Sequence, residues 1–345
     1  MQTVARTVAL TKTYGRITAV DHLNIEVPAR SVFGLLGPNG AGKTTTIRML
    51  LGLVRSSDGW IELLGHVHGD HDYKDALRRV GALIEGPALY PALSGRRNLD
   101  IHSRYLKLEN PRARADQVLD AVGLRDRAGD KVRKYSQGMR QRLGIAIALL
   151  GKPEVLILDE PTNGLDAAGI VEMRTMMKRL PEFGASVILS SHLLSEVEMT
   201  CDHVAIMNGG RLVVGGETSE IMYRYGRTNR IRVVVVSDDH ARAGVALSGA
   251  GYRFASPRYG TFDVEVPPGV TGRYLTWTLA QAGVYADEVS ATRMSLEDVF
   301  LNLTGEQYSA ADDLGGAPVD ELRADELRPE NAQQAIPPEA DDVAR

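Results

Sequence analysis

The chain has 345 residues, a length that corresponds to about two domains at roughly 150 residues each. Hydrophobic residues make up 43% and charged residues 24%, which is ordinary for a globular protein and excludes collagenous and wholly disordered chains. The net charge is −4, but residues 311–345 carry ten acidic residues and three arginines, net −7, which leaves +3 for residues 1–310. No basic surface of the kind that binds nucleic acid is therefore expected.

Two uncharged runs, residues 183–195 and 274–286, are the longest candidates for a membrane span. Both fall short of the ~20 apolar residues that a spanning helix needs. The first residues lack the basic and then apolar pattern of a secretory signal. Cys201 is the only cysteine and cannot form an intrachain disulfide, so we expect a small core residue in a reducing, cytoplasmic setting.

Short apolar runs alternate with helical patterns from residue 8 to about residue 226. The clearest runs are residues 32–36, 155–158 and 186–189. Such alternation predicts an α/β fold in which a buried, mostly parallel sheet is covered by helices.

The first motif is a complete phosphate-binding loop, which reads Gly37-Pro38-Asn39-Gly40-Ala41-Gly42-Lys43-Thr44. Thr45 follows it directly. An apolar strand precedes it and a helix predicted over residues 45–53 follows it, which is the context that the motif requires. The glycines let backbone amides turn toward a phosphate, and the helix start adds its positive dipole end. We expect Lys43 to span the β- and γ-phosphates and Thr44 to offer its hydroxyl to Mg²⁺. A glycine turn with a chance lysine is the alternative, which these flanks disfavour.

A cluster of potential metal ligands follows, comprising His66, His68, Asp70, His71 and Asp72. We do not expect it to bind a metal, because it lies in a polar loop between a strand and a helix. Neither a pair of cysteines nor a helical spacing supports such a site.

Asp159 and Glu160 directly follow the apolar run at residues 155–158. Ligands bind at the carboxyl ends of parallel strands, so we expect both carboxylates beside the phosphate loop. Asp159 suits a partner of Mg²⁺, and Glu160 suits the general base that orients the attacking water. A helix cap is the alternative, and it would be favoured if the phosphate loop were missing.

Residues 135–142 resemble the signature motif of ATP-binding cassette (ABC) ATPases, and they read Tyr135-Ser136-Gln137-Gly138-Met139-Arg140-Gln141-Arg142. This motif stands just before the strand that carries the acidic pair, as it does in that family. Tyr14, Asp166 and His192 match further family motifs in the correct order. The resemblance covers residues 3 to about 225. It implies a P-loop NTPase cassette over residues 1–225, with a helical subdomain at about 86–150, that binds and hydrolyses ATP with Mg²⁺.

The resemblance also implies a role for each motif. Ser136, Gln137 and Gly138 open a helix that runs to about residue 150, and in the family they face the nucleotide of a second subunit, so a homodimer is expected. His192 would contact the γ-phosphate and hold water and Glu160 in line, unless it is a core histidine. Tyr14 would stack on adenine, although an aromatic at a strand end is also a common packing residue. Asp166 would shape the dimer contact.

The chain departs from the family pattern at one functional position. Glu85 stands where the family usually carries Gln, in the loop that links the nucleotide to the partner. A carboxylate there would attract Mg²⁺ but repel the γ-phosphate, so the site would depend more on Mg²⁺ concentration and pH. The glutamate is similar to that of exporter ATPases for bacitracin-type and lantibiotic self-protection. The alternative is that Glu85 points to solvent. Gln137 and Met139 also replace commoner residues of the signature.

The pattern changes after residue 226. A strand, a helix, two strands around a turn at residues 259–260, a helix and a strand follow in that order. This order predicts a small α+β, ferredoxin-like accessory domain over residues 226–305. Ser295 to Asp298 predict the capped start of a last helix through Leu303. The acidic tail at residues 306–345 is expected to be unfolded.

The resemblance predicts the ATP-hydrolysing subunit of an ABC exporter of a drug, antibiotic or peptide. Its permease is expected to be a separate transmembrane chain, which docks beside residues 85–90 and holds this subunit at the inner face of the cell membrane. The alternative is a soluble ABC ATPase of translation or DNA repair, which usually carries two cassettes or a long coiled-coil insertion. A GTPase would need an Asn-Lys-x-Asp run, which the chain lacks.

Overall fold

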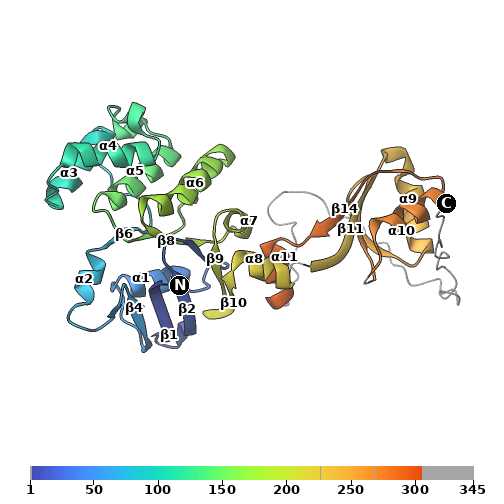
Figure 1. The fold of residues 1–345 in the computed structure, drawn as a ribbon, viewed down its shortest axis with the longest axis horizontal. Helices are drawn as coiled ribbons and strands as arrows, with labels where there is room; N and C mark the ends of the chain where they lie inside the picture. The colour runs from blue at the N-terminus through green and yellow to red at the C-terminus, as the bar shows by residue number, and fades with distance from the viewer. Residues whose placement is uncertain (1, 226, 268, 305–345) are drawn as a thin grey trace, which may run out of the picture. The chain divides into compact units, whose positions relative to one another are not determined.

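The computed structural model describes residues 2–225, 227–267 and 269–304 (Figure 1). These residues form two compact units, the first made of residues 2–225 and 294–304 and the second of residues 227–293. The predicted range 226–305 groups the last helix with the accessory domain, whereas that helix belongs to the first unit. The predicted acidic tail lies outside the described residues.

A six-stranded sheet forms the centre of the first unit. Its strand order is β10-β9-β3-β8-β7-β6, and only the pair β9–β10 is antiparallel. The strands are β3 (Val32–Leu36), β6 (Val80–Leu83), β7 (Val155–Leu158), β8 (Ser186–Ser191), β9 (His203–Asn208) and β10 (Arg211–Glu217). Every residue of β3, β7 and β8 is buried, as expected for strands that are covered on both faces. The mostly parallel sheet that the sequence predicts is confirmed.

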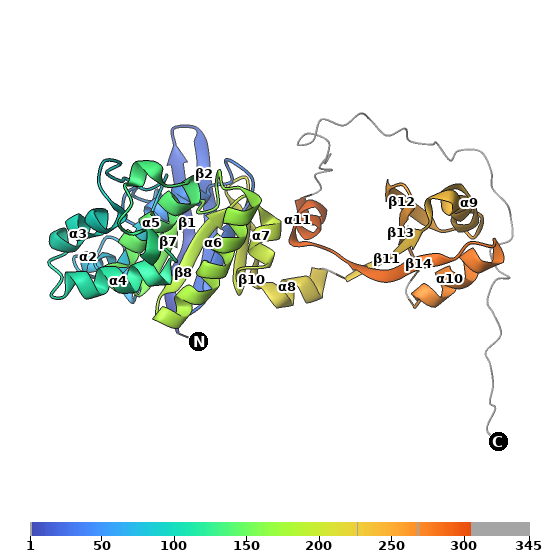
Figure 2. The ribbon, with the colours of Figure 1, turned by 90° about the horizontal axis from the view of Figure 1, so that it is seen from above.

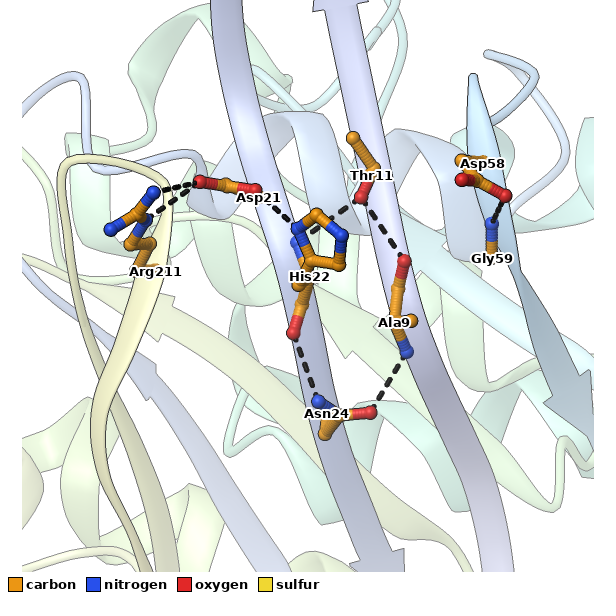
Figure 3. Close-up of polar contacts among 8 residues, drawn as sticks. All are labelled: Ala9, Thr11, Asp21, His22, Asn24, Asp58, Gly59 and Arg211. Carbon is orange, nitrogen blue, oxygen red and sulfur yellow. Dashed lines mark hydrogen bonds and ion pairs between the residues drawn. The ribbon is translucent and has the colours of Figure 1, made fainter.

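A second, antiparallel sheet was not expected from the sequence. Its order is β2-β1-β4-β5, with β1 (Thr3–Tyr14), β2 (Ile17–Pro28), β4 (Asp58–Leu63) and β5 (His66–Val67). The register between β1 and β2 shifts in the middle, where Ala9 and His22 both have a positive φ. Asn24 stabilises this irregular stretch by accepting from Ala9 N (2.8 Å) and donating to His22 O (2.9 Å) (Figure 3). Arg211 of β10 binds Asp21 of β2 at 2.6 Å in the same view.

Helices cover the central sheet and build the predicted helical subdomain. Helix α1 (Lys43–Leu50) follows β3, and α2 (Tyr73–Leu77) precedes β6. The subdomain consists of α3 (Gly95–Tyr105), α4 (Pro111–Ala121), the short turns η1 (Arg125–Arg127) and η2 (Val132–Lys134), and α5 (Gln137–Leu149), which Figure 1 shows gathered together. Leu99, Leu119 and Leu143 are completely buried and hold these helices together.

The remaining helices of this unit are α6 (Ala167–Arg179), η3 (Leu180–Phe183), α7 (Leu194–Glu198), α8 (Thr218–Tyr225) and α11 (Leu296–Thr304). Helix α11 buries Leu296 and Phe300 in the same core cluster as the central sheet. Its first amide, Leu296 N, donates to Glu198 Oε2 at 2.9 Å. Ser295 and Asp298 cap the helix reciprocally, as the sequence predicts. These contacts explain why α11 belongs to the first unit.

The second unit has the βαββαβ order that the sequence predicts. It runs β11 (Arg227–Val235), η4 (Ser237–Asp239), α9 (His240–Gly249), β12 (Arg253–Arg258), β13 (Thr261–Glu265), α10 (Gly272–Gln281) and β14 (Ala286–Arg293). The antiparallel sheet order is β12-β13-β11-β14, which is the ferredoxin-like order. Helices α9 and α10 pack together (Figure 2), and Leu247, Phe262 and Leu275 are buried in this unit's own core. In neither unit does a described helix combine the length and apolarity needed to span a bilayer.

Candidate functional site

The phosphate loop connects β3 to α1 at the carboxyl edge of the central sheet. Gly37 and Gly42 have φ values of 146° and 100°, which residues with a side chain rarely adopt. A Cβ atom at Gly37 would lie 2.2 Å from Met207 O, and one at Gly42 would lie 2.4 Å from Ala19 O. The close packing against two neighbouring strands therefore requires glycine at both positions and fixes the shape of the loop.

Lys43 places its ammonium group inside this loop. Its side chain is only 6% exposed, and Nζ donates to Gly37 O at 2.7 Å and to Pro38 O at 3.2 Å. Nζ also lies 3.4 Å from Glu160 Oε1. A buried cation in a glycine-rich loop at a helix start is a site for a phosphate group.

Asp159 lies directly across from Thr44. Its Oδ1 accepts from Thr44 Oγ1 at 3.2 Å and from Ser190 Oγ at 2.6 Å. The aspartate follows β7 and is buried, so the apolar strand that the sequence identified brings it to the loop. A hydroxyl and a carboxylate oxygen are hard donors of the kind that Mg²⁺ prefers, and this pair fits the ion.

Glu160 turns toward the loop in a strained conformation. Its φ is +48°, which costs of order 1–3 kcal/mol for a residue with a side chain. Its amide donates to Ser190 Oγ at 2.9 Å, and its Oε2 lies 2.7 Å from His192 Nδ1. The carboxylate therefore has Lys43 at one oxygen and His192 at the other. This arrangement orients a carboxylate that can accept a proton.

Ser190 is a site residue that no sequence motif indicated. It lies in β8 with its side chain fully buried, and it is hydrogen-bonded to both acidic residues. The available signal was a pair of serines, Ser190 and Ser191, that directly follows the apolar run at residues 187–189 and precedes His192. A buried hydroxyl needs hydrogen-bond partners, which this edge of the sheet supplies.

The signature residues lie at the start of α5. Ser136 is exposed and caps the helix by accepting from Met139 N at 3.2 Å. Gln137 Nε2 donates to Asn163 O at 3.1 Å, which ties the signature to the loop before α6. Asp166 caps α6 in turn by accepting from Gly169 N at 3.0 Å. Among the described residues, no hydrogen bond links Ser136 or Asp166 to the phosphate loop of the same chain.

Tyr14 ends β1, and its ring is 48% exposed. The Lys12 ammonium lies 4.9 Å from the ring centroid, which is cation–π distance. Such an exposed ring has the accessible face that stacking on a base requires. The role of Tyr14 remains a prediction.

Glu85 follows β6 with a φ of +58° and forms an ion pair with Arg48 of α1. Its side chain is 66% exposed, and that of Arg48 is 39% exposed. Arg48 lies one helical turn after Thr44, so the pair connects the loop after β6 to the helix that holds the phosphate loop. From the sequence we expect Mg²⁺ or solvent beside Glu85, whereas the structure places Arg48 there.

The histidine-rich loop has structural contacts. His66 Nδ1 lies 2.8 Å from Asp72 Oδ2, and this hydrogen bond lowers the pKa of Asp72. The His68 ring meets Tyr73 edge-on at 5.0 Å. Cys201 is buried in the core, and burial raises the pKa of its thiol.

The chain matches the ABC transporter family model over residues 20–163. It is also 40% identical over 309 residues to the bacitracin transport ATP-binding protein BcrA of Bacillus licheniformis, a match that covers 88% of this chain and 98% of that protein. The chain belongs to the ABC transporter ATP-binding proteins. As a member of that family it is an ATPase, which binds and hydrolyses ATP.

Other comparisons agree with this assignment. The ABC ATPase is 38% identical to the daunorubicin resistance ATP-binding protein DrrA3 of Streptomyces coeruleorubidus, over 86% of this chain and 94% of that protein. Its fold is similar to that of cbiO1 from Clostridium perfringens, part of the ABC transporter complex cbiONQ, with a TM-score of 0.60 and 26% identity. That match covers 65% of this chain and 92% of the other. The predicted P-loop NTPase cassette is thereby confirmed.

Proposed function

We propose that this ABC ATPase powers the export of a drug, antibiotic or peptide through a separate membrane permease. The observation that carries the proposal is the match to drug-transport relatives along almost their whole length, which extends beyond the cassette into the second unit. These relatives are named for bacitracin transport, daunorubicin resistance and linearmycin resistance. They support an exporter rather than a soluble ATPase of translation or DNA repair.

In the proposed reaction, Glu160 accepts a proton from the water that attacks the γ-phosphorus of ATP. The bond between the γ-phosphorus and the bridging oxygen breaks, and ADP and phosphate leave. His192, 2.7 Å from Glu160, orients the base, and Lys43 stabilises negative charge on the phosphate oxygens. Thr44, Asp159 and Glu85 are the residues proposed to hold Mg²⁺, which neutralises phosphate charge when it is bound.

We propose further that two copies of the chain enclose the nucleotides. Ser136, Gln137 and Gly138 are at the start of a helix and leave their outer side open, so a second copy packed head to tail can offer them to its partner's ATP. Asp166 would shape this contact, and Tyr14 would stack on adenine. Hydrolysis removes the phosphate that bridges the copies, which would let them separate.

A permease is needed because the export step must cross the membrane. We propose that a cytoplasmic segment of the permease docks beside residues 85–90, where Tyr90 is half exposed, and holds the ATPase at the inner face of the membrane. The Arg48–Glu85 ion pair joins this region to the phosphate loop helix, so docking and nucleotide binding can affect each other.

A deletion and complementation experiment tests this function. We expect loss of the gene to raise susceptibility to at least one of bacitracin, daunorubicin and linearmycin. Wild-type protein should restore resistance, whereas Glu160→Gln at the same expression level should not. A tagged wild-type chain should also be recovered from membranes with a multi-span protein. Unchanged susceptibility together with recovery free of any membrane protein would contradict the proposal.

A further inference from the structure

The second unit has an open groove of about 750 Å³ for which the proposed function supplies no ligand. It lies along the outer face of α10, the start of the edge strand β12 and the end of β13. Its wall includes three aromatic side chains, Tyr252, Tyr274 and Trp277, together with Pro267 and Gln281. A groove of this size and composition is suited to a ligand with apolar groups.

Helix α10 has two apolar faces, and only one of them is used by the fold. Leu275 and Leu279, four residues apart, are completely buried in the core of the second unit. Tyr274 and Trp277, three residues apart, face the groove and are 40% and 51% exposed. Exposed aromatic side chains that line a groove are typical of a binding surface.

The groove also carries an uncompensated positive charge. Arg253 of β12 lies opposite Glu265 of β13 in the strand register. Glu265 is engaged by Arg230, whose Nη2 lies 2.5 Å from Glu265 Oε1, while the guanidinium of Arg253 makes no hydrogen bond or ion pair with any described residue. Residues 227–293 contain eight arginines against six acidic residues. The fitting ligand is therefore apolar and anionic.

Three aromatic rings in one groove suit a proline-rich segment. Such segments form extended polyproline II structure, which loses little entropy on binding and packs its rings on aromatic side chains. The chain contains a segment with this chemistry at residues 336–342, Ile336-Pro337-Pro338-Glu339-Ala340-Asp341-Asp342. It combines the one Pro-Pro pair after residue 304 with three carboxylates. We propose that Ile336 to Glu339 dock in the groove, with the prolines on Tyr274 and Trp277 and Glu339 beside Arg253.

A long stretch of chain separates the last described helix from the proposed segment. The second unit ends at Arg293, and helix α11 accounts for nine of the residues that follow. A flexible coil of 31 residues, the number from 305 to 335, has an r.m.s. span of roughly 30 Å. A linker of this kind provides an effective concentration on the order of 1 mM, which would fill about 90% of sites with a dissociation constant of about 0.1 mM. Docking therefore needs only weak affinity.

Tryptophan fluorescence tests the proposal directly. The chain has two tryptophans, so Trp60→Phe leaves Trp277 as the reporter. We compare the full chain with one that ends at residue 334, without nucleotide. The emission maximum of the full chain should lie at a shorter wavelength than that of the truncated chain. A synthetic peptide of residues 333–345 should shift the emission maximum of the truncated chain to the value of the full chain, with a dissociation constant of about 0.1 mM. Calorimetry of the same peptide with truncated chain that retains Trp60 provides a second measurement.

The controls come from the chain itself. Tyr274→Ala should weaken peptide binding at least ~10-fold, as expected for loss of a central aromatic contact, whereas Tyr285→Ala, also an exposed tyrosine of this unit but outside the groove, should not. Arg253→Gln should weaken it about 3-fold. A peptide of residues 314–326, acidic with the single Pro318, should not bind.

Two results would overturn the proposal. The first is identical emission of the full and truncated chains together with no effect of 1 mM peptide. The second is an emission shift that depends on protein concentration, which would mean that the segment binds a second copy. Neither measurement uses ATP, so failure here leaves the export proposal untouched.

Discussion

Ser190→Ala is the substitution that most directly tests how the site is built. The change removes one oxygen and leaves the fold of β8 intact. Two groups then lose a partner: Asp159 Oδ1, which accepts from Ser190 Oγ at 2.6 Å, and the amide of Glu160, which donates to it at 2.9 Å. Among the described residues, the carboxylate of Asp159 then retains only the longer bond from Thr44, at 3.2 Å.

The expected cost follows from these two bonds. A hydrogen bond to a charged group contributes about 1.5–3 kcal/mol, and a buried amide without an acceptor costs about 1–3 kcal/mol. Since the alanine has no hydroxyl to desolvate, we expect a net loss of about 3 kcal/mol in unfolding free energy. For a unit of this size, that lowers the thermal midpoint by about 6–12 °C. Turnover should fall about 10- to 100-fold, because Glu160 loses the contact that holds its strained backbone.

Ser191→Ala is the matched control. This neighbouring serine is also buried, but within the described part of the chain its hydroxyl only accepts from Leu193 N at 3.0 Å. We expect it to cost about 1 kcal/mol and to leave turnover near normal. Thermal unfolding and ATPase rates at saturating Mg-ATP compare the two variants. Equal stability and equal turnover of both would refute the role assigned to Ser190.

Three further predictions test other parts of the site and fold. Lys43→Ala should abolish nucleotide binding in calorimetry, and unchanged affinity would count against the phosphate loop assignment. Arg48→Ala should weaken ATP binding up to about 5-fold at low Mg²⁺, since the exposed ion pair with Glu85 contributes at most about 1 kcal/mol. The same substitution should have no effect in a chain that also carries Glu85→Gln. Equal effects of Arg48→Ala in both backgrounds would exclude coupling through the ion pair. Burial lowers the pKa of His102 below its ordinary value of 6.5, so the unfolded chain binds more protons and stability falls as pH drops below 6.5. His102→Leu should reduce the loss of thermal midpoint between pH 7.5 and 5.5, and an unchanged loss would contradict this.

The sequence predicted the elements whose signals are local. The central strands are continuous apolar runs, and the phosphate loop is a contiguous motif, so both could be placed without knowledge of tertiary contacts. The antiparallel sheet was missed because its first two strands are irregular. Ala9 and His22 interrupt their register with positive φ values, which break the alternation of buried and exposed residues.

The contacts that the sequence did not reveal join residues far apart in the chain. Arg48 and Glu85 form an ion pair although they are 37 residues apart, and nothing in the local sequence of either residue predicts this partner. Helix α11 returns to the first unit through Leu296 and Glu198, which are 98 residues apart. Only the folded arrangement reveals such pairs, whereas the capped start of α11 is local and was predicted correctly.

We propose that two copies of the chain close over bound ATP and separate when it is hydrolysed. Light scattering of Glu160→Gln saturated with Mg-ATP measures this association, with the Lys43→Ala/Glu160→Gln double variant as control. We expect the mass to rise from 37.5 kDa to about twice that value for the single variant and to stay at 37.5 kDa for the double variant. A single variant that remains monomeric at saturating nucleotide would exclude the ATP-bound dimer.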